Sequence, residues 1–221
     1  MKISLVLFTW NEIDGMRAIM PRIKPEWYDE LIICDGGSVD GTLEFARENG
    51  WNIFVQEKPG AGNAFLESMQ RATGDIVITF SPDGNSVPEL IPDLIAKMTE
   101  GYDIVIVSRY LGDAKSEDDD WLTAFGNWMF TTLVNVLFRA GITDAFVMFR
   151  ACKSSLAKEL NVLEQSNSYQ TQLMLRAVKA GKRIGEIPGD EPARIGGVRK
   201  MSPLKHGWKE LKMIIGEFFN R

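Results

Sequence analysis

The 221-residue sequence contains little cysteine and no long apolar run. Its two cysteines, Cys34 and Cys152, show no CxxC spacing, so we expect two reduced, buried thiols rather than a disulfide framework. No stretch of about 18 apolar residues is present, and no simple membrane-spanning helix is predicted. The apolar residues 1–8 lead into a polar turn instead of a cleavage site, so no secretory signal is predicted. We expect a cytoplasmic protein.

Histidine is also scarce, and acidic residues outnumber basic ones, 30 to 25. The single histidine, His206, is interpreted as a solvated helix residue. The formal net charge is −5, and no nucleic-acid partner is predicted. The charge is uneven, because residues 194–221 hold seven Lys and Arg against two Glu, a net of +5, which leaves −10 on the rest of the chain. This basic segment predicts an anionic partner near the C-terminus.

The remaining composition, 45% hydrophobic and 25% charged, is that of an ordinary globular protein. A chain of this length can bury a substantial core without disulfides or structural metals. We predict one domain over residues 1–202, followed over 203–221 by an amphipathic basic helix at the membrane periphery.

Short β-rich runs alternate with helical spacing through the first hundred residues. Strands are predicted at Ile3–Phe8, Glu30–Cys34, Asn52–Gln56, Asp75–Phe80 and Asp103–Val107, with helices near 13–23, 41–49, 62–72 and 88–99. This alternation predicts an α/β fold with a mainly parallel sheet flanked by helices. Ligands of such sheets bind beyond the carboxyl ends of the strands. Four predicted strands run there into polar residues: Thr9-Trp10-Asn11-Glu12, Asp35-Gly36-Gly37-Ser38, Ser81-Pro82-Asp83 and Ser108-Arg109.

The string from Cys34 to Thr42 places an acid at a strand end, then two glycines, then a second acid before a helix. Asp35 is suited to hydrogen bonding with a nucleobase or ribose. Asp40 and Ser38 are both placed to cap the following helix. For Asp40, this structural role and a ligand-binding role are given equal weight.

The turn Ser81-Pro82-Asp83-Gly84-Asn85 follows the fourth predicted strand. A nucleoside diphosphate leaving group needs a cation, and Mg²⁺ or Mn²⁺ prefers oxygen ligands. Asp83 and the amide oxygen of Asn85, two residues apart, are predicted to face one ion. Pro, Asp, Gly and Asn are also frequent turn residues, so a purely structural turn is the alternative.

Taken in order, these motifs resemble family 2 glycosyltransferases of the GT-A (nucleotide-diphospho-sugar transferase) fold, and most of all the dolichol-phosphate and polyprenol-phosphate mannosyltransferases. The resemblance covers residues 3 to about 201. It includes Asn11-Glu12, the Asp35 string and the Asp83 turn. Later matches are Gly60-Ala61-Gly62-Asn63-Ala64, Val107-Ser108-Arg109-Tyr110, Asp144 with Phe149-Arg150, Tyr169 with Gln172, and Arg194 with Gly197, Lys200 and Met201.

The resemblance implies a role for each matched residue. The nucleotide-sugar donor would be held by Thr9, Asn11, Glu12, Asp35, Gly62, Ser81 and Asp83, and Mg²⁺ or Mn²⁺ by Asp83 and Asn85. Catalysis would rest on Asp83 with Arg109, Arg194 and Lys200, whose positive charges suit phosphate groups. The acceptor would contact Asp144, Arg150, Tyr169 and Gln172.

The chain departs from the family pattern in several places. Ser81 stands where an Asp is usual, so the metal site has one carboxylate fewer. Residues 145–148 replace Pro-Thr-Ser-Gly with Ala-Phe-Val-Met, which makes the acceptor pocket more apolar. Met174 replaces a frequent Glu, and Arg199 replaces a frequent Ser.

We therefore predict a metal-dependent, inverting hexosyltransferase that moves a sugar, with mannose or glucose as candidates, from a nucleotide diphosphate to a polyprenyl or dolichyl phosphate. A phosphate acceptor is largely ionised at neutral pH, its second pKa being about 6, so a general base is dispensable. A hydroxyl acceptor would need a base, for which Asp144 is the candidate. A weakly active nucleotide-sugar-binding protein is a further alternative, and a nucleotidyltransferase is disfavoured because Thr-Trp-Asn-Glu follows strand one.

Two segments with helical spacing point to a membrane surface. Leu204, Trp208, Leu211, Ile215 and Phe218 share one face of the predicted C-terminal helix, with lysines around the rest. The stretch from Trp121 to Arg139 carries a second stripe: Trp121, Phe125, Trp128, Met129, Leu133, Val136 and Leu137. Such a stripe is equally typical of a helix packed into the core. The prediction is peripheral attachment to the inner face of a membrane.

Overall fold

A computed structural model describes residues 1–196 and 203–220, with side chains at 203–205 left out. Its strands form a seven-stranded sheet in the order β3-β2-β1-β4-β6-β5-β7. Their bounds are β1 Ile3–Thr9, β2 Glu30–Asp35, β3 Ile53–Val55, β4 Ile76–Phe80, β5 Ile104–Ser108, β6 Arg150–Lys153 and β7 Ile184–Pro188. All pairings are parallel except those of β6, which runs antiparallel between β4 and β5.

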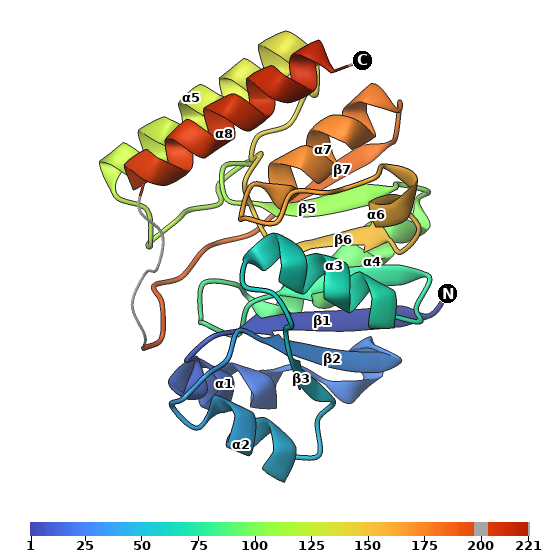
Figure 1. Ribbon diagram of the computed structural model, residues 1–221, viewed down its shortest axis with the longest axis vertical. Helices are drawn as coiled ribbons and strands as arrows, with labels where there is room; N and C mark the ends of the chain where they lie inside the picture. Colours follow the sequence, from blue (N-terminus) through green and yellow to red (C-terminus); the bar gives the residue numbers. More distant parts are fainter. Residues whose placement is uncertain (197–202, 221) are drawn as a thin grey trace.

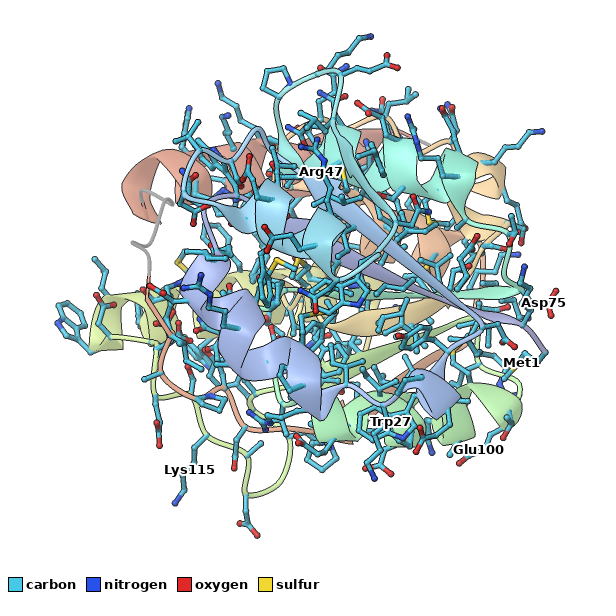
Figure 2. The ribbon with its side chains drawn as sticks, turned by 90° about the horizontal axis from the view of Figure 1, so that it is seen from below. Met1, Trp27, Arg47, Asp75, Glu100 and Lys115 are labelled. Carbon is cyan, nitrogen blue, oxygen red and sulfur yellow. The ribbon has the colours of Figure 1, made fainter. Side chains whose placement is uncertain are left out.

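Helices cover both faces of the sheet (Figure 1). In Figure 2, Arg47 of α2 and Glu100 at the end of α4 lie on opposite sides of the strands. The helices are α1 Ile13–Ile19, α2 Thr42–Glu48, α3 Ala61–Arg71, α4 Ile91–Thr99, α5 Trp121–Phe138, α6 Leu156–Glu159, α7 Tyr169–Lys179 and α8 Pro203–Phe219. Three short 3-10 turns lie at Met20–Arg22, Pro25–Trp27 and Pro88–Leu90. The predicted fold class is therefore confirmed.

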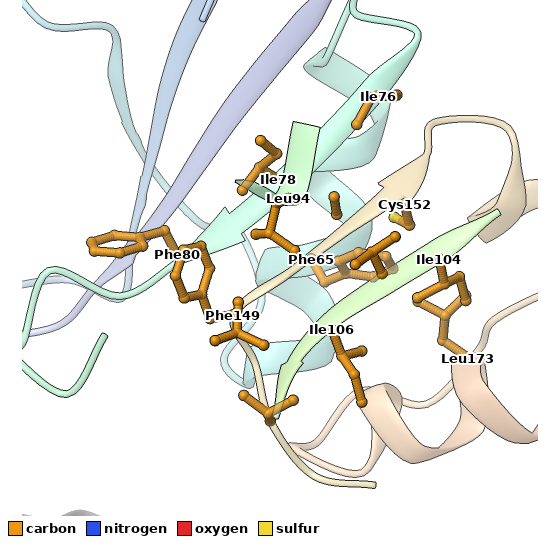
Figure 3. Packing of buried hydrophobic residues seen from close by; sticks show 14 of the residues in the cluster. Phe65, Ile76, Ile78, Phe80, Leu94, Ile104, Ile106, Phe149, Cys152 and Leu173 are labelled. Atoms are coloured by element: carbon orange, nitrogen blue, oxygen red, sulfur yellow. The ribbon is translucent and has the colours of Figure 1, made fainter. Parts of the chain in front are cut away.

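The core lies between the sheet and these helices (Figure 3). The buried strands β4 and β5, with the sequences IVITF and IVIVS, are almost wholly apolar because both of their faces are covered. Phe80 meets Phe149 edge to face, with ring centroids 5.1 Å apart, and this contact ties β4 to the chain entering β6. The thiols of Cys34 and Cys152 are free and buried, and burial raises their pKa values to about 12 and about 11.

Two helices lie outside the sheet layers. Helices α5 and α8 lie side by side and run in the same direction (Figure 1), with Phe138 against Phe218 at 5.9 Å between ring centroids. Glu217 anchors α8 to α7, because its carboxylate accepts hydrogen bonds from Arg176 and Lys179. None of the described helices is both long and apolar enough to cross a membrane.

The aromatic stripe of α5 faces outward. Its buried positions are Asn127, Thr131 and Val134, while Trp121 and Trp128 are 79% and 64% exposed. The predicted apolar face of α8 is likewise open, because Trp208 is 60% exposed. The face of α8 that packs inward carries Ile214 with two glutamates, Glu210 and Glu217. The aromatic residues of both stripes therefore lie at the surface, whereas Leu133 and Leu137 of the α5 stripe pack against the core, so each alternative for α5 holds for part of the stripe.

Candidate functional site

One large cavity, of about 960 Å³, opens at the carboxyl ends of the central strands. Its polar side is lined from β1, β4 and β5 and from residues 189–194 of the chain after β7. Its apolar side is lined from α5, α8 and residues 146–149. Thr9, Ser81, Asp83 and Arg109 from the predicted strand ends line it, and so do Asn85 and Arg194.

Asp35 is fully buried at the end of β2. Its Oδ1 accepts the backbone N–H groups of Gly37 and Ser38 at 2.8 and 2.6 Å. Its Oδ2 accepts the hydroxyls of Thr9 and Ser38, both at 2.7 Å. Both carboxylate oxygens are thus engaged within the chain, and Asp35 shapes the loop that borders the cavity.

The turn after β1 is fastened to the loop after β2. Asn11, with a positive φ of 55°, donates its backbone N–H to Ser38 Oγ and accepts the N–H of Val39 through Oδ1. Asp40 accepts hydrogen bonds from Ile13 and Thr42. Asp40 therefore has a structural role, but neither Asp40 nor Ser38 caps α2, whose N-cap residue is Gly41.

The glycine-rich loop before α3 packs against the backbone of residues 164 and 165. Gly62 donates its N–H to the carbonyl of Gln165, and a Cβ there would lie 2.0 Å from the carbonyl oxygen of Glu164. Gly62 is therefore a packing glycine, while its neighbours Gly60 and Ala61 line the cavity.

The turn after β4 brings together the predicted metal ligands. Asp83 is 7% exposed, and its Oδ1 accepts the backbone N–H of Asn85 at 3.1 Å. The side-chain oxygen of Asn85 is buried and lacks a hydrogen-bond partner among the described residues. An oxygen acceptor without a donor, beside a carboxylate, fits a hard cation. The described part of the chain holds no cluster of three His, Cys, Asp or Glu side chains for a metal, so Asp83 and Asn85 would supply two ligands only.

Arg194 lies across this turn. Its Nη2 is 2.7 Å from Asp83 Oδ2, and its Nη1 is 3.0 Å from Glu12 Oε1. Glu12 is 8% exposed at the start of α1, so the guanidinium joins two buried carboxylates from different strand ends. The third predicted cation of the site, Lys200, lies outside the described residues, as do Gly197, Arg199 and Met201.

Arg109 follows β5 and is enclosed by acids. Its Nε is 2.7 Å from Asp144 Oδ2, and its Nη1 is 3.1 Å from Glu191 and 3.6 Å from Asp119. Burial lowers the pKa of Arg109, but the carboxylates of Asp144 and Glu191 outweigh it and hold the pKa well above its ordinary value. The guanidinium is permanently charged.

Asp144 is fully buried beneath Arg109. Burial is the largest single influence and raises its pKa, but the charge of Arg109 and the hydrogen bonds to the carboxylate together outweigh it, so the net pKa is below its ordinary value. A buried, ionised carboxylate fixed by an Arg positions that Arg, and it has a poor driving force for taking a proton. The assignment of Asp144 as the base for a hydroxyl acceptor is not supported by this geometry.

The other predicted acceptor residues lie in the framework behind the cavity. Arg150 is 1% exposed and donates to the carbonyls of Val147 and Gln170, and burial lowers its pKa. Tyr169 stacks on Phe65 with centroids 4.7 Å apart. Gln172 accepts the N–H groups of Leu163 and Glu164 and donates to Glu217 of α8. None of the three side chains lines the cavity.

No site role was predicted from the sequence for His206 or Glu210. His206 and Glu210, one turn apart on α8, both line the cavity, and Glu210 is 2% exposed. The interpretation of His206 as a solvated helix residue is therefore wrong. The spacing of four between a histidine and an acid was the available signal, but nothing in the sequence showed that this face of α8 turns inward.

The strand order and the cavity at the strand ends define the class: the molecule has the architecture of the GT-A nucleotide-sugar glycosyltransferases. The sequence narrows the class further. Residues 4–160 match the model of glycosyl transferase family 2, and the chain belongs to that family.

Similar proteins come from mycobacteria. An uncharacterized glycosyltransferase of Mycobacterium bovis is 27% identical over 205 residues, covering 93% of this chain and 92% of that protein. The structure of glucosyl-3-phosphoglycerate synthase from Mycobacterium tuberculosis with phosphoglyceric acid has a TM-score of 0.78, with 20% identity, over 98% of this chain and 79% of that one. The same enzyme with Mn²⁺, UDP and phosphoglyceric acid gives 0.77, with 20% identity, over 99% and 78%. Family membership is thus confirmed, while the mannosyltransferase subgroup stays a prediction.

Proposed function

We propose that the protein transfers a hexose from a nucleotide diphosphate sugar to a lipid phosphate, in a reaction that requires Mg²⁺ or Mn²⁺. The observation that carries the proposal is the division of one cavity into two halves. Asp83, Asn85, Arg194 and Arg109 line the polar half at the strand ends. Helices α5 and α8, with residues 146–149, line an apolar half that opens toward exposed aromatic side chains.

The polar half suits the donor. Asp83 and Asn85 would hold the cation, which when bound neutralises charge on the diphosphate. Arg194 would contact the diphosphate oxygens, for which a guanidinium fork is well shaped. The loop shaped by Asp35, with Trp10 and Gly36 at the cavity wall, would border the nucleoside. The solved neighbours that contain Mn²⁺ and UDP support this arrangement by analogy of fold.

The apolar half suits a hydrocarbon chain. Phe146, Val147 and Met148 bring three large side chains to the wall where the related motif is small and polar, and Phe130 packs edge to face on Phe146 at 5.9 Å. In the proposed reaction the acceptor phosphate oxygen attacks the anomeric carbon as the bond to the diphosphate breaks, with inversion.

A donor and acceptor screen tests the proposal. UDP-, GDP- and dTDP-hexoses are incubated with a polyprenyl phosphate, with Mn²⁺ or with excess EDTA, and release of the nucleoside diphosphate is measured together with labelled lipid. We expect metal-dependent transfer from one donor class. Release of nucleoside diphosphate without labelled lipid, under every condition, contradicts the lipid acceptor.

The second candidate is a hydroxyl acceptor, and the His206–Glu210 pair favours it. The pair borders the apolar half, where a proton acceptor is useful only if the attacking oxygen carries a proton at neutral pH. A polyprenol and a phosphoglycerate, offered in parallel with the polyprenyl phosphate, distinguish these acceptors. Glucosylation of phosphoglycerate alone would favour a small phosphorylated acceptor of the kind named in the solved neighbours.

A further inference from the structure

Arg194 occupies the carboxylate that the metal needs. Asp83 Oδ2 accepts Nη2 of Arg194 at 2.7 Å, and Asp83 Oδ1 accepts the backbone N–H of Asn85. A divalent cation held by Asp83 would need the same carboxylate. Two positive charges on one carboxylate repel each other, so guanidinium and metal compete for it.

The backbone around Arg194 is fixed to the same turn. The N–H of Ile195 donates to the carbonyl of Asp83 at 2.7 Å. Gly84 has a φ of +93°, and a Cβ there would lie 2.7 Å from the Ile195 side chain, so the two segments pack closely. The side chain of Arg194 is therefore held beside Asp83 by its main chain, and only rotation of the side chain can free the carboxylate.

The guanidinium has a second anchor and a spare donor. Nη1 keeps its contact with Glu12 at 3.0 Å, while Nε is buried without an acceptor among the described residues. A guanidinium that lacks one hydrogen bond is ready to take a further oxygen acceptor, and a diphosphate brings several. A guanidinium released from Asp83 could therefore bind the diphosphate in the same cavity.

We propose that Arg194 is the resident cation of the Asp83 site and is exchanged for the metal when the nucleoside diphosphate arrives. In the free protein it contacts both Asp83 and Glu12 and offsets part of their negative charge, so the metal binds weakly alone. With a nucleotide present, the guanidinium turns to the diphosphate and the metal takes Asp83. Metal and nucleotide therefore bind cooperatively. This inference rests on the proposed donor site.

Titration of Mn²⁺ into the protein, followed by the electron paramagnetic resonance signal of free Mn²⁺, tests the exchange without any turnover. Arg194→Gln should bind Mn²⁺ without nucleotide about tenfold more tightly than wild type, since a charge-assisted hydrogen bond no longer opposes the metal. With UDP present the order should reverse, because the variant has lost its diphosphate contact. Arg22→Gln, which removes an exposed ion pair with Glu89, is the matched control and should leave both affinities unchanged.

Unchanged or weaker Mn²⁺ binding by nucleotide-free Arg194→Gln would overturn the exchange. Arg194→Lys keeps a positive charge but cannot bridge both carboxylates, so its Mn²⁺ affinity without nucleotide should lie between those of wild type and Arg194→Gln. If Arg194→Gln does not fold, the affinity of Arg194→Lys tests the exchange in its place. Wild type with UDP, GDP or dTDP reports separately on the donor site. If no nucleotide restores Mn²⁺ binding while Arg194→Gln binds Mn²⁺ alone, Arg194 still opposes the metal and the proposed donor site is wrong.

Discussion

Nε2 of His206 lies 3.3 Å from Oε1 of Glu210, and the two side chains border the apolar half of the cavity. Burial raises the pKa of Glu210, and the nearby Thr171 and Ser168 hydroxyls act in the opposite direction without cancelling it. Burial also lowers the pKa of His206, with help from the positive charge of Lys209. Both shifts favour the uncharged forms, so the pair brings little net charge to a weakly polar wall.

The histidine shift can be measured directly because His206 is the single histidine of the sequence. Its ring resonance in a pH titration by NMR needs no assignment, and the midpoint should lie below the ordinary 6.5. Lys209→Gln should raise the midpoint, since it removes a repelling charge. Lys212→Gln, on the same helix but stacked over Trp208, should leave it unchanged. A wild-type midpoint above 6.5 would show an ionised Glu210 partner and contradict the apolar environment.

Two glutamates on α8 should respond to pH with opposite signs. Burial raises the pKa of Glu210, so the folded state binds its proton more tightly and loses stability as pH rises through that raised pKa. Burial acts the same way on Glu217, but Arg176, Lys179 and Gln172 prevail and its pKa is lowered, so its contribution is present above about 4.5 and is lost in acid.

Thermal unfolding at pH 4 and pH 7.5 therefore distinguishes Glu210→Gln from Glu217→Gln. Relative to wild type, Glu210→Gln should gain stability at the higher pH. Glu217→Gln should lose about 1–3 kcal/mol there, since hydrogen bonds to two cations are broken. Changes of the same sign in both variants would show that one of the two environments is wrongly described.

The comparison with the sequence shows which features are local. Strands β1, β2, β4 and β5 are apolar runs that end in polar residues, and both their existence and the cavity at their ends were predicted correctly. Strands β6 and β7 were missed. Charged residues stand at both ends of β6, which leaves two residues between Arg150 and Lys153. Gly185, Glu186 and Pro188 interrupt β7, so neither strand shows an apolar run.

In the site, too, the local features were predicted from the sequence and the tertiary contacts were not. That Asp83 stands at a strand end is a local property, whereas its contact with Arg194 joins residues 111 apart in the chain. Likewise, the motif predicted Asp35 at the donor, but its burial and the hydrogen bond that it accepts from Thr9 of β1 depend on how β1 and β2 pair. Pairing of this kind is set by tertiary packing, and no periodicity in the sequence reports it.

Asp35 offers a test that separates a loop role from a donor contact. Asp35→Asn can direct its oxygen to the two backbone N–H groups and its amide to the two hydroxyls, which are able to accept, so stability should change by about 1 kcal/mol or less. Asp35→Ala leaves several buried donors without a partner and should cost about 2–4 kcal/mol in chemical denaturation. If Asp35→Asn keeps its stability but binds UDP more than tenfold more weakly, Asp35 contacts the donor directly, as the family resemblance implies.

The Asp83 turn should control dependence on the metal. Asp83→Asn should abolish most donor turnover while the fold, monitored by circular dichroism, is kept. Ser81, which lines the same cavity, stands where the family has an acid, so Ser81→Asp should tighten the apparent affinity for Mn²⁺. Full activity of Asp83→Asn, or of wild type in excess EDTA, contradicts the metal assignment. An unchanged affinity in Ser81→Asp places that residue outside the coordination sphere.

The exposed aromatic residues of α5 and α8 make the last prediction. Trp121 is 79% exposed, Trp128 64% and Trp208 60%, on two helices that lie side by side. Lys209 and Lys212 are also exposed on α8, and each lysine near an anionic surface contributes about 1 kcal/mol. Apolar side chains beside lysines are the features of a helix that lies in a bilayer interface. We therefore expect the protein to float with liposomes that contain anionic lipid, and to bind less at high salt.

Replacing Trp128 and Trp208 together by Ala should reduce liposome binding more than tenfold, because each buries a large apolar area in the interface. The double change of Lys209 and Lys212 to Gln should weaken binding only to anionic vesicles, since neutral lipid offers these charges no attraction. Leu163→Ala is the matched control: Leu163 is 60% exposed, like Trp208, but lies between α6 and α7. Retention of wild-type binding by the tryptophan variant, or failure of wild type to float at low salt, would refute the membrane role. Without a membrane beside it, the apolar half of the cavity would have no source of lipid acceptor. A small acceptor with a hydroxyl group would then explain better why His206 lines the cavity.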